Sequence, residues 1–87
     1  MSSGTLIRLY DTWGSGSYTC FARLRKYKRK EGYRVEVLHK YFSGAWRTIA
    51  AGQVFSIEEA ADFVAEHEQL VTKKQVLKAF EEVGVIA

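Results

Sequence analysis

Apolar and polar side chains alternate with a period of two along much of the first half of the chain, between short segments that contain glycine. Such alternation is typical of β-strands with one buried face. It predicts four strands, at residues 5–11, 18–28, 33–42 and 45–51. Because the connections between them are short, we expect an antiparallel meander.

Beyond residue 55 the apolar positions change to helical spacing. Two capping-box patterns precede the apolar stripes: Ser56 with Glu59, and Thr72 with Gln75. We therefore expect helices over residues 57–69 and 73–83, the second ended by Gly84. His67 falls on the apolar side of the first helix, where a partly buried packing role is expected.

Strands followed by helices predict a single α+β domain over residues 1–87. The expected fold is a four-stranded antiparallel β-meander followed by two C-terminal α-helices packed on one face of the sheet. The chain contains no proline, no internal repeat and no low-complexity tract that would suggest a linker or a second domain.

Two-residue hairpin turns at 31–32 and 43–44 would set the register of the sheet. The pairings that such turns predict are Leu24 with His39 and Tyr41 with Trp46. The face expected to meet the helices is mostly apolar: Cys20, Ala22, Leu24, Val35, Val37, Tyr41, Trp46 and Ala50. The other face is richer in cations: Phe21, Arg23, Arg25, Tyr27, Arg34, Glu36, Leu38, Lys40, Phe42, Arg47 and Ile49. A three-residue turn at 30–32 would instead shift the first pairing by one residue and mix the two sets.

The charge of the chain is unevenly distributed. Residues 1–55 carry ten basic and three acidic side chains, whereas residues 56–87 carry three basic and seven acidic ones. The first half is therefore suited to a polyanionic partner, and the acidic side chains of the second half, Glu68 among them, are expected to be solvated. This separation is also compatible with weak head-to-tail self-association at low salt.

The stretch RLRKYKRKEGYR, residues 23–34, places seven cations among two tyrosines and one acid. Cations neutralise phosphates, and exposed rings stack on bases, so this hairpin predicts a nucleic-acid-binding surface. The residues expected to form it are Arg23, Arg25, Lys26, Tyr27, Lys28, Arg29, Lys30, Arg34, Lys40 and Arg47. The pattern does not distinguish DNA from RNA.

Two other interpretations of the same stretch remain open. The long basic side chains could lie over Leu38 and Ile49, pair with Glu36 and keep the sheet edge soluble. Alternatively, the surface could bind an acidic protein, as in a small protein-binding or inhibitory module of the phage or mobile-element type.

Catalytic and metal sites are not predicted. Cys20 and His39 could approach on neighbouring strands, but both are expected to face the core and no third, orienting acid is identifiable. One cysteine and two histidines offer no zinc-ligand spacing, and GSGS at 14–17 lacks the Lys-Ser/Thr of a phosphate-binding loop. We expect a binding module without a cofactor, not an enzyme.

Residues 52–67, GQVFSIEEAADFVAEH, are similar to the strand-to-helix join of small sheet-plus-helix DNA-binding domains, such as the plant AP2 type and the arm-type domain of phage integrases. The likeness consists of an aromatic residue, a capping box and an alanine-rich helix face, which any such join requires. It assigns no family and no site residue.

The chain has no run of about 18 apolar residues and no signal-peptide pattern at its start. A single cysteine forms no internal disulfide, in keeping with a reducing compartment. The sequence therefore predicts a cytoplasmic protein without a membrane partner.

Overall fold

The computed structural model describes residues 5–83. Its elements are β1 (Thr5–Asp11), β2 (Tyr18–Lys26), β3 (Tyr33–Tyr41), β4 (Trp46–Val54), α1 (Ile57–His67) and α2 (Lys73–Glu82). The strands form one antiparallel sheet in the order β1-β2-β3-β4. The predicted meander followed by two helices is confirmed, and no element ends more than three residues from its expected position.

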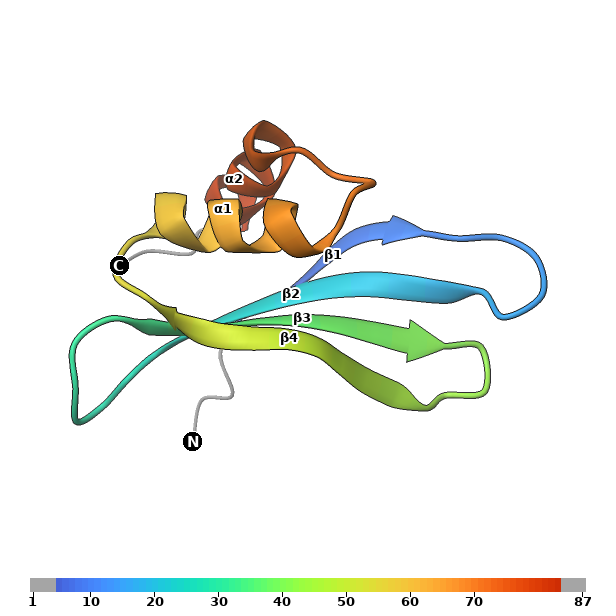
Figure 1. Cartoon of the computed structure of the whole chain (residues 1–87), viewed down its shortest axis with the longest axis horizontal. Coiled ribbons are helices and arrows are strands. Elements are labelled where there is room, and N and C mark those ends of the chain that lie inside the picture. The colour runs from blue at the N-terminus through green and yellow to red at the C-terminus, as the bar shows by residue number, and fades with distance from the viewer. Residues whose placement is uncertain (1–4, 84–87) are drawn as a thin grey trace.

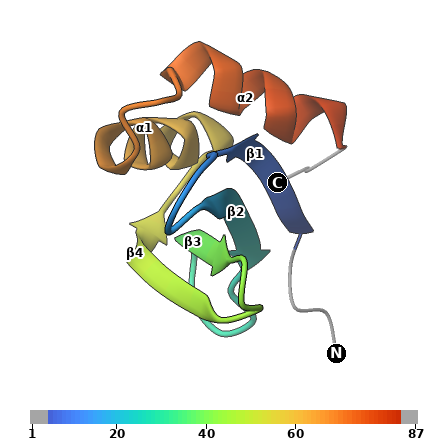
Figure 2. The same cartoon turned by 90° about the vertical axis from the view of Figure 1, so that its right-hand side faces the viewer.

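Both helices lie on the same face of the sheet, as Figures 1 and 2 show. Helix α1 packs against β3 and β4, and α2 packs against β1. The core between these layers is built from the inward-facing side chains of the strands and the apolar stripes of the helices, including Val35, Val37, Val64, Val76 and Phe80. Within residues 5–83, no helix is long and apolar enough to cross a membrane.

Both helices begin where the capping patterns predict. The Ser56 side chain accepts a hydrogen bond from Glu59 N at 3.0 Å, while the Glu59 carboxylate accepts one from Phe55 N at 3.3 Å. At α2 the box is reciprocal, because Thr72 Oγ1 accepts from Gln75 N at 3.2 Å and Gln75 Oε1 accepts from Thr72 N at 2.9 Å. These bonds satisfy backbone donors that have no partner inside a helix. The expected stop at Gly84 lies outside the described residues.

The connection between β2 and β3 is longer than predicted. Strand β2 ends at Lys26 and β3 begins at Tyr33, so Leu24 pairs with Val35 and not with His39. A type I′ turn at 31–32 would need positive φ at both central residues, whereas only Gly32, at φ +90°, has it. The predicted register was therefore wrong by four residues. Because four is an even number, the side chains of β2 and β3 keep their predicted faces.

The connection between β3 and β4 inverts part of a prediction. The turn is a three-residue loop closed by Tyr41 N donating to Ala45 O at 2.8 Å, and Gly44 takes φ +93°. This loop places Trp46 opposite Lys40 and Arg47 opposite His39, and a register shift between Val37 and Leu38 then pairs Val37 with Ala50. Trp46 thus lies on the open face and Arg47 on the helix-covered side of the sheet. Both assignments were predicted the other way round.

Helix α1 approaches β4 closely at a glycine. A Cβ on Gly52 would lie 2.9 Å from a ring carbon of Phe63, so the ring can pack over the strand only because no side chain is present there. The Phe63 ring also contacts the ring of His67, with centroids 4.4 Å apart. His67 itself is exposed, which corrects the expectation of partial burial.

Candidate functional site

The basic residues of the β2–β3 connection form a projecting tip. Figure 1 shows this loop extending from one end of the sheet. The four cations of the tip are all exposed: Lys26, the last residue of β2, and Lys28, Arg29 and Lys30 of the loop. The loop is anchored, because Tyr27 N donates to Gly32 O at 3.2 Å and Gln53 Nε2 of β4 donates to Glu31 O at 2.9 Å. The cations are therefore displayed on a defined turn.

Gly32 is required for this arrangement. It has φ +90°, and a Cβ at this position would lie 2.5 Å from the carbonyl oxygen of Val54. Any side chain would clash with the backbone of β4 and would also strain the left-handed conformation. The packing of Gly32 against Val54 therefore sets how closely the tip approaches β4.

Tyr27 is half-buried beside the tip. The Lys30 ammonium lies 4.3 Å from its ring centroid, a cation–π contact worth about 0.5–1 kcal/mol at an exposed site. One face of the ring is thus occupied within the protein. A nucleobase could stack on Tyr27 there only if Lys30 moved.

Three arginines of the open face converge on one carboxylate. Glu36 is only 5% exposed, and its oxygens lie 2.8 Å from Arg23 Nε and 3.6 Å from both Arg25 Nη2 and Arg34 Nε. The hydrogen bond from Arg23 lowers the pKa of Glu36 and raises that of Arg23; burial opposes both shifts. Three cations sharing one anion leave an excess of two positive charges, so this part of the face stays basic.

The remaining predicted site residues lie far from the tip. Lys40 is exposed near the other end of β3, seven residues from Tyr33, a separation of about 23 Å at the usual rise per strand residue. Its ammonium lies 5.5 Å from the ring centroid of Trp46, which in turn packs against Phe21 with centroids 5.2 Å apart. Arg47 is exposed but on the helix side of the sheet. The ten predicted residues therefore form no single patch.

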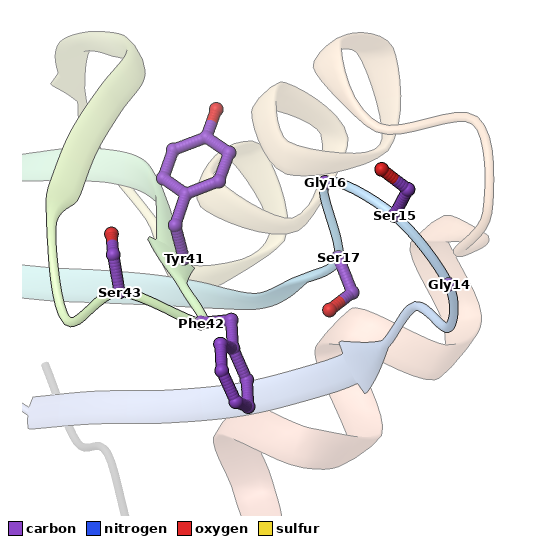
Figure 3. A pocket seen from close by; sticks show the side chains of 7 residues that line it. All are labelled: Gly14, Ser15, Gly16, Ser17, Tyr41, Phe42 and Ser43. Carbon is purple, nitrogen blue, oxygen red and sulfur yellow. The ribbon is translucent and has the colours of Figure 1, made fainter.

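A groove lies at the end of the sheet opposite the tip, between the β1–β2 loop and the β3–β4 turn. Its volume is about 620 Å³, and Figure 3 shows the side chains that line it, among them Tyr41 and Phe42 pointing in opposite directions. Trp13 and Phe42 are 90% and 96% exposed. Phe42 lines the groove and Trp13 lies in the adjoining β1–β2 loop, but single exposed aromatic side chains are common on protein surfaces and do not by themselves mark a site.

A second polar site is buried between the sheet and the helices. Cys20 and His39 are direct cross-strand partners on β2 and β3, and Glu68 caps the C-terminus of α1. The Glu68 Oε1 atom lies 3.2 Å from Cys20 Sγ and 3.0 Å from His39 Nε2, and it also accepts a hydrogen bond from the Tyr10 hydroxyl. Glu68 is 6% exposed, so its expected solvation was wrong.

The surroundings of this cluster control its protonation. Burial raises the pKa of the Cys20 thiol to about 12, with a further contribution from its bond to Glu68. Burial also raises the pKa of Tyr10. For Glu68 burial opposes ionisation, but the hydrogen bonds from Tyr10, His39 and Cys20 outweigh it and lower the carboxyl pKa. The result is a buried carboxylate that is held by three hydrogen bonds.

The sequence could not reveal this cluster. Strand alternation places Cys20 and His39 on the same face of the sheet, as predicted. Glu68, however, comes from the end of a helix, and no sequence spacing connects it with either residue. At neutral pH the thiol is protonated, and Cys20 has no exposed surface. These properties do not suit a nucleophile.

Comparison of the chain with known protein families, with curated proteins and with solved structures found no match.

Proposed function

We propose that the protein is a small nucleic-acid-binding module, not an enzyme, and that it contacts the phosphate backbone through the β2–β3 tip. The observation that supports this proposal is the state of the four tip cations, Lys26, Lys28, Arg29 and Lys30. All are exposed, and within residues 5–83 none of them forms an ion pair. Such cations on an anchored, projecting turn can bind phosphates without first breaking a salt bridge, although Lys30 would exchange its weaker cation–π contact with Tyr27 for the phosphate.

The open face of the sheet has a secondary role in this proposal. Arg23, Arg25 and Arg34 already bind Glu36, so a phosphate must compete with that carboxylate. Their excess positive charge still attracts a polyanion over a distance of about one Debye length. We therefore expect the tip to provide most of the contacts and the arginines to steer the approach.

Salt dependence tests the tip directly. Four phosphate contacts predict that the logarithm of the affinity for duplex DNA falls with the logarithm of the salt concentration at a slope of about −3 to −4. The triple variant Lys28→Gln, Arg29→Gln, Lys30→Gln should flatten this slope by about two to three. A fluorescence titration at several salt concentrations, repeated with single-stranded DNA and RNA, measures both values.

A matched control is available on α2. Lys74 and Lys78 are exposed on the helix layer, and their double glutamine variant should leave the slope unchanged. An equal effect of both variants would indicate non-specific charge attraction in place of binding at the tip. If no binding to any of the three nucleic acids is measurable at about 50 mM salt, where screening is weak, the proposal is wrong. An acidic protein partner then becomes the better interpretation of the tip.

A further inference from the structure

The buried cluster contains the donor atoms of a transition-metal site. A thiol sulfur, an imidazole nitrogen and a carboxylate oxygen, from Cys20, His39 and Glu68, all lie within 4.8 Å of one another. This is the ligand set that Zn²⁺ uses in proteins, and catalytic zinc sites commonly have three protein ligands and a fourth position for water. All three residues are buried. This cluster differs from the exposed groups of carboxylates that are common on protein surfaces without an ion, because it contains a sulfur ligand and its residues are buried.

The distances are close to those of a tetrahedral site. Ordinary zinc bond lengths give edges of about 3.4–3.6 Å between the ligand atoms. Glu68 Oε1 lies 3.0 Å from His39 Nε2 and 3.2 Å from Cys20 Sγ. An outward movement of a few tenths of an ångström along these two edges would open the site, and the Cys20 Sγ and His39 Nε2 atoms lie within 4.8 Å of each other. Side-chain rotations of that size leave the backbone in place.

Neighbouring groups already orient the ligands. The Tyr10 hydroxyl donates to the Glu68 carboxylate, and the Tyr18 ring stacks on the His39 imidazole with centroids 3.8 Å apart and planes 14° from parallel. The backbone N–H of Glu68 donates to Val64 O at 2.9 Å and holds the cap in position. Such outer contacts are typical of metal ligands, whose geometry they fix.

Charge balance also favours a divalent cation. A thiolate and a carboxylate together carry two negative charges, so a divalent ion and a neutral imidazole would make the buried site electrically neutral. We infer that Cys20, His39 and Glu68 form a binding site for a borderline divalent metal of the zinc type. On binding, the Cys20 S–H bond breaks, the sulfur bonds to the metal and one proton is released to solvent. His39 loses to solvent the Nε2 proton that it donates to Glu68 and takes one on Nδ1, so that the neutral imidazole coordinates through Nε2.

Cobalt(II) provides the test, because it substitutes for zinc and absorbs visible light. The full-length protein, treated with a chelator and then dialysed, is titrated with Co²⁺ alone. One equivalent should produce the visible bands of a four-coordinate ion together with a thiolate-to-cobalt charge-transfer band in the near ultraviolet. Adding Zn²⁺ should abolish both. Zinc at about 100 times its dissociation constant should raise the midpoint of thermal unfolding by about 10 °C or more.

Variants separate this site from others. Cys20 is the only cysteine, so a thiolate band can come from no other residue. Cys20→Ser, with its fold checked by circular dichroism, should lose the charge-transfer band, and Glu68→Gln should weaken binding by tenfold or more. His67→Gln is the matched control, because His67 is exposed and outside the cluster.

Two results would overturn the inference. The first is the absence of cobalt bands and of any zinc-dependent shift in the wild-type unfolding midpoint. The second is that cobalt binds without producing a thiolate band, and that this binding persists in Cys20→Ser or is lost in His67→Gln. The wild-type measurements need no variant to fold, so the inference remains testable even if substitutions in the core are not tolerated.

Discussion

Two glutamates, Glu36 and Glu68, are buried to the same extent but by different means. Glu36 is on the open face of the sheet and Glu68 is between the sheet and the helices, with exposed fractions of 5% and 6%. Glu36 is surrounded by three arginines that keep more than a quarter of their side-chain surface in solvent. Glu68 is held by a tyrosine, a cysteine and a histidine.

The difference shows two ways of keeping a carboxylate charged inside a small domain. At Glu36 cations compensate the charge directly, and their partial exposure limits both the gain and the loss if the carboxylate is removed. At Glu68 the donors converge inside the core, where a polar group without a hydrogen-bond partner strongly destabilises the folded state. The two sites should therefore respond very differently to the same substitution, and to the same chemical reagents.

The largest expected contrast between the two faces is in thiol reactivity. Cys20 has no exposed surface, so a thiol reagent should modify the native protein about a thousandfold more slowly than the unfolded chain, if opening requires about 4 kcal/mol. The matched control is Thr48→Cys in a Cys20→Ser background, since Thr48 is exposed. That cysteine should react at nearly the unfolded rate. Rapid stoichiometric labelling of native Cys20 would contradict the assignment of faces.

Truncation of Glu68 should follow in size. Glu68→Ala leaves the donors of Tyr10, Cys20 and His39 without their common acceptor, and we expect a loss of about 3 kcal/mol in the free energy of unfolding. Urea denaturation followed by circular dichroism measures it. Glu66→Ala on the exposed side of α1 is the control and should change stability by less than about 0.5 kcal/mol. Equal effects of the two variants would mean that the buried bonds contribute little.

Substitution of Glu36 should have a smaller effect. In Glu36→Gln the three arginines lose their counter-charge, but each can turn toward water, so we expect a loss of about 1 kcal/mol at pH 7. Added salt should reduce this difference, because solvent ions screen the partly exposed pairs. A loss of stability as large as that of Glu68→Ala would show that solvent does not compensate the charges of the partly exposed arginines.

The smallest effect is the pH dependence of that difference. The arginines lower the pKa of Glu36 in the folded protein, so its contribution is complete above the unfolded value of about 4.3 and is lost as the pH falls through the folded pKa. Wild type and Glu36→Gln should therefore differ at pH 7 and converge as the pH falls below the unfolded value and through the folded pKa of Glu36. Denaturation curves at several pH values measure this. A difference that does not shrink as the pH is lowered would have to come from packing and not from charge.

Strand pairing shows which features of the sheet the local sequence pattern can predict and which it cannot. The register predicted for β2 and β3 was wrong by four residues, yet Cys20, Ala22 and Leu24 are buried as predicted, because an even shift preserves the alternation of faces. At β4 the three-residue loop before the strand was enough to exchange Trp46 and Arg47. Side-chain alternation is a local property, whereas register depends on the loop that joins two strands.

The sequence by itself determined the helix starts, the order of the elements and the face on which the β2 and β3 side chains lie. Capping at Ser56 and Thr72 and the period of two in the strands act over a few residues, so they can be identified without the fold. Only the tertiary structure decided the partners of Glu68, which lie 29 to 58 residues away along the chain. Their convergence depends on the angle at which α1 crosses the sheet, and no local pattern encodes that angle. The exposure of the tip cations was similarly decided by the six residues between β2 and β3 and by the contact of Gly32 with Val54.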